Sequence, residues 1–198
     1  MFYNLKELSF AHPEIKNIAS YANYEVKTGR LVRLKRDLYT DNPKEDPLLI
    51  GCFLCRPSYV SFQYALSYYG LIPERVFAYT MATTGLRRRK TIENRFGRFL
   101  YRCIPSEVYP WGLVSNEEGF LMATPEKALC DLLHIYPGVR NEKDLISLLF
   151  EDLRIDIDEF DRLSAEDLLF LCDRYPGDTF RVLKSFIEKR RKNESHSL

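Results

Sequence analysis

Two dipeptides, Asp46-Pro47 and Thr124-Pro125, constrain the fold most strongly, because each marks the start of a helix. The aspartate or threonine side chain accepts hydrogen bonds from amides of the first turn, and proline has no amide to leave unpaired there. These signals predict helices over residues 47–55 and 125–136. The proline at position 57 ends the first of them.

Shorter segments fill the rest of the chain. Apolar residues at helical spacing, flanked by capping residues, predict further helices, and β-rich runs between turn residues predict strands. The additional helices are expected over 14–24, 62–69, 141–150, 156–163, 164–175 and 179–191, and the strands over 30–39, 75–80, 98–104, 108–115 and 119–122.

This order of elements predicts an α+β fold in three parts. A short helix followed by a basic hairpin indicates a reduced N-terminal winged helix in residues 1–42. A central unit with mixed helices and a small sheet is expected over 46–137, and a helical C-terminal part over 141–192.

Composition excludes some classes of protein. With 198 residues, 45% of them hydrophobic, the chain can bury a core. Its longest apolar stretch, residues 47–55, is too short to cross a bilayer, and the N-terminus has no export signal, so we expect a cytoplasmic protein with no membrane partner. The five cysteines lack the spacing of a disulfide framework and are expected as thiols.

Charge is segregated although the net charge is only +1. Residues 86–102 hold seven basic side chains and one acidic one, whereas residues 151–178 hold ten acidic and three basic. Two such patches either steer charged partners or pair with each other inside the fold.

Two basic segments are candidate binding sites. The hairpin residues Arg30, Arg33, Lys35 and Arg36, with Lys27 before them, are predicted to contact DNA phosphates; the alternative is a solvated hairpin. The run Arg87, Arg88, Arg89 and Lys90 is predicted to meet an anionic partner, either nucleic acid or an acidic protein face; the alternative is a mobile surface loop.

Three segments, in order, carry a family resemblance. Residues 29–39 read Gly-Arg-Leu-Val-Arg-Leu-Lys-Arg-Asp-Leu-Tyr, residues 59–71 begin Tyr-Val-Ser-Phe-Gln-Tyr-Ala-Leu and end Tyr-Gly-Leu, and residues 123–131 read Ala-Thr-Pro-Glu-Lys-Ala-Leu-Cys-Asp. They resemble the wing hairpin and two later motifs of the AbiEi-family antitoxins, and the similarity covers roughly residues 25–135. Asp37 stands where the family's wing has glycine, and aspartate tolerates a left-handed turn better than most residues.

The resemblance implies a function. Members of this family carry an N-terminal winged helix that represses their own operon, and a larger C-terminal part that accompanies antitoxic activity. Their partner is a nucleotidyltransferase-like toxin, in a pair usually described as non-contacting (type IV). The resemblance therefore implies promoter DNA as one partner and such a toxin as the other.

Catalysis has little support in the sequence. Cys52 and Cys55 have redox spacing but apolar neighbours, and Cys130 and His134 offer only two metal ligands, so core packing is the preferred interpretation of both pairs. We therefore expect no enzymatic activity, catalytic residue, metal or cofactor. Two alternatives stay open. One is a protein-binding module without DNA recognition, since only 28 residues precede the wing segment; the other is a nucleic-acid-processing enzyme at Arg87–Lys90, where Glu93 is the carboxylate nearby.

Overall fold

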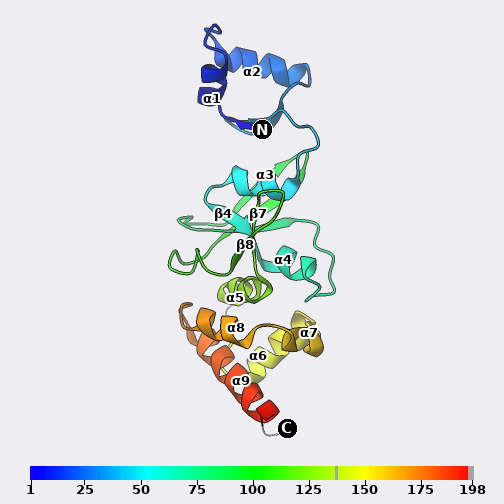
Figure 1. The fold of residues 1–198 in the computed structure, drawn as a ribbon, viewed down its shortest axis with the longest axis vertical. Helices are drawn as coiled ribbons and strands as arrows, with labels where there is room; N and C mark the ends of the chain where they lie inside the picture. Colours follow the sequence, from blue (N-terminus) through cyan, green and yellow to red (C-terminus); the bar gives the residue numbers. More distant parts are fainter. Residues whose placement is uncertain (137, 196–198) are drawn as a thin grey trace.

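The computed structural model describes residues 1–136 and 138–195, and the side chains up to residue 192. It has an α+β fold, as predicted. Figure 1 shows an elongated molecule in which the N-terminal unit, the central sheet with its helices, and the C-terminal helices follow one another along the long axis.

The N-terminal unit combines two helices with a small antiparallel sheet. Its elements are β1 (Phe2–Tyr3), α1 (Leu5–Ala11), α2 (Ile18–Lys27), β2 (Val32–Lys35) and β3 (Leu38–Thr40), with strand order β1-β3-β2. A separate core of Leu8, Ala22, Leu31 and Tyr39 holds them together. The unit therefore consists of a helix pair followed by a hairpin, to which β1 adds a third strand.

Two details of this unit differ from the sequence prediction. The helix expected over 14–24 begins at Ile18, because the Asn17 side chain, 3.0 Å from the amide of Ser20, caps it and Pro13 lies in the preceding turn. Helix α1 was not predicted. Asn4 and Glu7 form a reciprocal capping box at its start, a signal that the sequence contains.

The hairpin turn contains Asp37 in the left-handed region, with φ of 57°. Its carboxylate accepts a hydrogen bond of 2.7 Å from the amide of Leu5, at the first turn of α1. Aspartate therefore makes a contact here that glycine cannot make, which compensates for the strain of the turn.

The central unit is a six-stranded sheet with helices on both faces. The strands are β4 (Ser58–Val60), β5 (Tyr79–Thr83), β6 (Lys90–Asn94), β7 (Gly97–Cys103), β8 (Leu113–Ser115) and β9 (Leu121–Ala123), in the order β6-β7-β5-β4-β9-β8. The pairs β5–β7 and β4–β9 are parallel, and the other pairs are antiparallel. The helices are α3 (Pro47–Leu54), α4 (Phe62–Tyr68) and α5 (Pro125–Ile135).

Helix α3 covers one face of this sheet and α5 the other, as Figure 1 shows. At Gly51 of α3 the backbone comes so close to the sheet that a Cβ atom would lie 3.0 Å from the Met81 side chain. The predicted helix starts at 47 and 125 are confirmed. The strand expected over 75–80 begins only at Tyr79, and β4 and β6 were not predicted, so Lys90 belongs to a strand and not to a loop.

The C-terminal part is helical, as predicted. It contains α6 (Glu142–Ile146), a π-helical stretch η1 (Ser147–Asp152), α7 (Ile157–Asp161), α8 (Ala165–Cys172) and α9 (Asp178–Ser195), so the helix expected over 141–150 continues with a wider turn. One hydrophobic cluster runs from Leu34 to Ile187 and includes Leu129 and Leu168, so the central and C-terminal parts share a core, which Leu34 of β2 also joins. Within the described residues, no helix has both the length and the apolar character needed to span a membrane.

Candidate nucleic-acid interface and the buried joint

The wing presents part of its basic charge beside helix α2. Arg33, on β2, donates a hydrogen bond to the Asn23 side chain of α2, and its guanidinium lies 5.6 Å from the centre of the Tyr39 ring. Lys27 at the end of α2 and Arg36 in the hairpin turn are exposed. The structure therefore brings Arg33 to the same surface as an amide side chain of the second helix.

Two other predicted contact residues have partners inside the protein. Arg30 makes two hydrogen bonds, of 2.5 and 2.7 Å, with the carboxylate of Glu25, whose side chain is buried. This pairing raises the pKa of Arg30 and lowers that of Glu25. Lys35 is half-buried, and its Nζ donates to the carbonyl oxygen of Leu54 over 2.6 Å. Arg30 thus fixes the start of the wing, and Lys35 fastens the wing to α3.

The second basic run ends at Lys90, which lies close enough to the wing for its charge to act on Lys35. Arg87, Arg88, Arg89 and Lys90 are exposed, and in the part of the chain that the structure describes none of them pairs with a carboxylate. Burial, and next the charge of Lys90, lower the pKa of Lys35. The Asn94 side chain at the end of β6 donates a 3.1 Å hydrogen bond to the carbonyl of Leu34 on β2. The two basic segments, far apart in sequence, therefore adjoin at this contact between wing and sheet.

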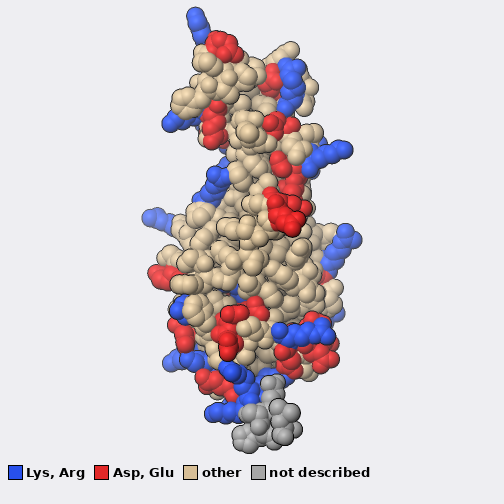
Figure 2. All heavy atoms as spheres, viewed as in Figure 1, with Lys and Arg blue, Asp and Glu red and all other residues tan. Residues whose placement is uncertain are grey.

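Part of the acidic C-terminal segment is paired with cations of the C-terminal part. Glu159 pairs with Arg162, Asp178 with Arg181, Asp161 with Arg190 at 2.5 Å and Asp173 with Lys184 at 2.5 Å. Figure 2 shows acidic and basic side chains interspersed at this end of the molecule. Among the residues described, no ion pair joins residues 86–102 to residues 151–178. The basic surface is thus left available to an anionic partner.

A buried polar network joins the other two family-like segments. Asp131 of α5 accepts hydrogen bonds from the hydroxyls of Tyr59 (2.8 Å) and Ser61 (2.6 Å), and also from the hydroxyl of Tyr175. The ammonium of Lys127 lies 3.2 Å from the Asp131 carboxylate and donates to the carbonyl of Val108 over 3.0 Å. Burial lowers the pKa of Lys127 and raises those of Tyr59 and Tyr175.

The network uses a serine that stands at the N-cap position of α4. Ser61 precedes α4, but its hydroxyl is used on Asp131 and does not cap that helix. The hydroxyl of Thr80 on β5 instead accepts the amide of Tyr64 over 2.9 Å. The sequence signal for the network is a lysine and an aspartate four residues apart on a helix with few polar neighbours, which we did not predict as a buried pair.

Glu126 completes this buried joint between the sheet and the C-terminal helices. Its carboxylate is buried and accepts a 2.9 Å hydrogen bond from the amide of Ser164, the residue that caps α8. The Ser164 hydroxyl in turn accepts the amide of Asp167 over 3.2 Å. In a capping box, an acid within the helix accepts the amide of the capping residue. Here Glu126, from α5, has that role for α8.

Cys52, Cys55, Cys130 and Cys172 lie in or against the hydrophobic core, beside which His134 packs. All five cysteines are free thiols, and Cys130 is fully buried. The ring of His134 lies 5.8 Å from that of Tyr175. Burial raises the pKa of Cys52 to about 11 and that of Cys172 to about 12. In the described chain, no three His, Cys, Asp or Glu side chains form a group able to hold a metal ion.

Fold and surface together define an α+β protein with an N-terminal helix–hairpin unit and an unpaired basic surface beside it. No family model matches the chain, and a search of curated proteins finds no match. One similar solved structure is the crystal structure of the Rv2827c protein from Mycobacterium tuberculosis, with a TM-score of 0.59 and 15% sequence identity. The match covers 94% of this chain and 71% of that one, and at this identity it shows a shared fold alone.

Proposed function

We propose that this protein is an AbiEi-type antitoxin that also represses its own operon. In this proposal the N-terminal unit binds promoter DNA, and the larger remainder of the chain counteracts a nucleotidyltransferase-like toxin in the cytoplasm. The protein acts by binding and makes or breaks no bond. The observation that carries the proposal is the surface on which Arg33 of the wing meets Asn23 of helix α2.

This surface has the chemistry that duplex DNA requires. Arginine and lysine neutralise backbone phosphates. The Asn23 oxygen accepts from Arg33, so the amide group of Asn23 is the part that can donate to an acceptor on a base edge. Lys27 and Arg36 are exposed in the same unit, and Lys90 extends the positive charge toward the central sheet. Arg30 and Lys35 have a structural role in this account, because their donors are used inside the protein.

We assign the antitoxic activity to residues 46–192. The family-like segments 59–71 and 123–131 both contribute to the joint around Asp131, which ties the sheet to the C-terminal helices. A variant that loosens this joint should therefore lose antitoxic activity before it loses DNA binding.

Fluorescence anisotropy with a labelled duplex tests the DNA-binding half of the proposal. The duplex carries the sequence upstream of the protein's own gene, and a scrambled duplex of equal length serves as reference. Arg33→Ala combined with Arg36→Ala should weaken binding by about tenfold or more, since each phosphate contact contributes to a salt-dependent term. Arg162→Ala with Arg181→Ala, two exposed arginines of the C-terminal part, is the matched control and should change nothing.

Absence of binding at low salt would favour a different function. The protein would then be a protein-binding module that does not recognise DNA. One observation supports this second candidate: two of the five basic residues expected at the wing and the end of α2, Arg30 and Lys35, already have partners inside the protein.

Co-expression tests the antitoxin half. If a gene next to this one encodes a nucleotidyltransferase-like protein, its expression alone should arrest growth, and expression of this chain should restore growth. The variant with Arg33→Ala and Arg36→Ala should still restore it. Failure of the intact chain to restore growth would contradict the assignment.

A further inference from the structure

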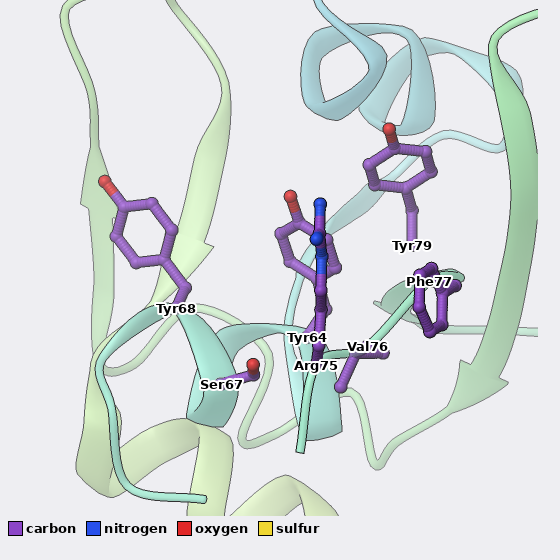
Figure 3. Close-up of a pocket in the computed structure, with 7 residues that line it drawn as sticks. All are labelled: Tyr64, Ser67, Tyr68, Arg75, Val76, Phe77 and Tyr79. Atoms are coloured by element: carbon purple, nitrogen blue, oxygen red, sulfur yellow. The ribbon is translucent and has the colours of Figure 1, made fainter. Parts of the chain in front are cut away.

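A pocket on the central unit has no role in the proposed function. It lies between α4 and the segment leading into β5, has a volume of about 320 Å³, and is lined by Tyr64, Ser67, Tyr68, Arg75, Val76, Phe77 and Tyr79 (Figure 3). That volume is in the range of small-molecule sites, which start near 300 Å³. We call it the aromatic pocket.

Its aromatic side chains include two that are unusually exposed. Phe77 is 84% exposed and Tyr68 is 62% exposed, whereas Tyr64 and Tyr79 are half-buried and pack against each other with ring centres 5.2 Å apart. Exposed aromatic rings gathered at one concave site are typical of a binding surface and not of a core. The two inner tyrosines therefore form the wall, and the two outer rings are available to a ligand.

The pocket also presents a cation without an acidic partner. Arg75 stands between Tyr68 and Phe77 in Figure 3, and its guanidinium is 5.7 Å from the centre of the Phe77 ring. In the described part of the chain Arg75 makes no ion pair. The carboxylate of the neighbouring Glu74 is bound by Arg154. Asp46, whose charge acts on Tyr64 and Tyr79, directs a carboxylate oxygen to the amide of Leu48 at 2.7 Å.

The walls of the pocket are held in place. The Ser67 hydroxyl donates a 2.7 Å hydrogen bond to the carbonyl of Glu74, which ties α4 to the segment that carries Arg75 and Phe77. On the other side Tyr79 stacks on Phe99 with ring centres 5.1 Å apart. A Cβ atom at Gly97 would lie 2.7 Å from the Tyr79 ring, so the glycine is needed to seat that ring.

We propose that the aromatic pocket binds a nucleotide unit, with its base stacked on Phe77 and its phosphate on Arg75. Stacking on aromatic rings accepts any base, and a guanidinium matches a phosphate, so the pair recognises an unpaired nucleotide and not a duplex. Arg95 and Arg98 are exposed and lie within two residues of Gly97, which abuts the Tyr79 ring of the pocket, so they add positive charge on that side. This charge favours a phosphate-bearing ligand over an apolar peptide. The nucleotide can come from a single strand or be free in solution.

Binding of fluorescein-labelled single-stranded oligonucleotides to the full chain, followed by anisotropy, tests this proposal. Titration of the full chain with adenosine monophosphate, measured by calorimetry, tests the binding of a free nucleotide. Phe77→Ala and Arg75→Gln should each weaken binding by about fivefold or more. Arg174→Gln and Phe170→Ala are the matched controls, since this exposed pair also combines a guanidinium with a phenyl ring, 3.3 Å apart, outside any such pocket.

The outcomes separate this proposal from the one on the wing. Arg33→Ala with Arg36→Ala should leave the binding of single strands and nucleotide in the pocket unchanged even where duplex binding is lost. Tighter binding of oligonucleotide than of mononucleotide identifies a strand as the ligand, and equal binding identifies the free nucleotide. Equal binding by the Phe77→Ala variant and the parent, or binding of a proline-rich peptide with no nucleotide bound, would overturn the proposal. Because Phe77 is exposed, its replacement should not impair folding.

Discussion

Asp131 of α5 lies in the centre of the protein. It therefore accepts more hydrogen bonds than a residue on the exposed surface of a helix would. Three hydroxyls and one ammonium converge on its two oxygens, and both Asp131 and Lys127 are fully buried. A buried ion pair gains little over a well-packed apolar pair, but removal of one partner leaves the other charged and unpaired. The cost of a single substitution here is therefore high.

We predict that Asp131→Ala lowers the free energy of unfolding by about 3–5 kcal/mol. The matched control is Asp161→Ala, which removes a half-exposed partner of Arg190 and should cost about 1 kcal/mol or less. Urea denaturation followed by circular dichroism measures both. Similar losses for the two variants would mean that the buried network contributes no more than a surface pair.

Tyr109 gives the protein a dependence on alkaline pH. Burial raises its pKa from 10.0 to about 12. The unfolded chain loses this proton from about pH 10, while the folded chain keeps it up to about pH 12, so the stability that it contributes is complete below pH 10 and is lost as the pH rises through that window. Tyr109→Phe should therefore show a smaller loss of stability between pH 9.5 and 11 than the parent, in urea denaturation at a series of pH values. An identical loss in both proteins would contradict this assignment.

At the scale of elements, the features that depend on a few neighbouring residues could be predicted from the sequence. The caps at Asp46 and Thr124 place α3 and α5 to the residue, because both the acceptor and the following proline are local. Strand β6 was not predicted, since Lys90 was grouped with the three arginines before it as a loop, and its pairing with β7 depends on residues 97–103. Similarly, β4 is only three residues long and is defined by its neighbours β5 and β9.

In the candidate site too, features set by local residues could be predicted, and contacts with distant residues could not. That the wing is basic could be predicted, and so could the turn at Asp37. The partners of Arg30 and Lys35 could not, because Lys35 reaches a carbonyl nineteen residues away, and the carboxylate of Glu25 faces Arg30 only after the chain has turned at residue 29. The adjacency of Lys35 and Lys90 depends on how the wing packs against the sheet.

Helix α8 depends on a residue outside itself, and this dependence can be measured. Glu126→Ala removes the acceptor of the Ser164 amide at the start of the helix, and an unpaired cap typically costs about 1 kcal/mol. We expect faster hydrogen exchange in residues 164–172 with little change in the N-terminal unit. Glu166→Ala, an exposed acid in the first turn of the same helix, is the control and should have the smaller effect. Equal exchange in the two variants would show that Glu126 does not hold the helix.

At the scale of the whole molecule, the C-terminal and N-terminal parts differ in their hydrophobic cores and in how their charges are paired. The C-terminal helices share their core with the central sheet and pair several of their acids with their own cations. The N-terminal unit has a small core of its own, joins the main core through Leu34, and borders Lys90 of the basic run. The end of the molecule that carries the wing is therefore the one that we propose for an anionic partner, and Lys90 of the run 87–90 adds its charge beside Lys35.

The salt dependence of duplex binding tests this account most directly. The measurement is the slope of log Kd against log salt concentration for the upstream duplex, in the parent, in the variant with Arg33→Ala and Arg36→Ala, and in a variant with Arg87, Arg88 and Arg89 each changed to glutamine. Each phosphate contact contributes about 0.9 to the slope, so both variants should show a slope shallower by roughly 1–3. Slopes that stay equal to the parent's in both variants would contradict the claim that this surface binds DNA.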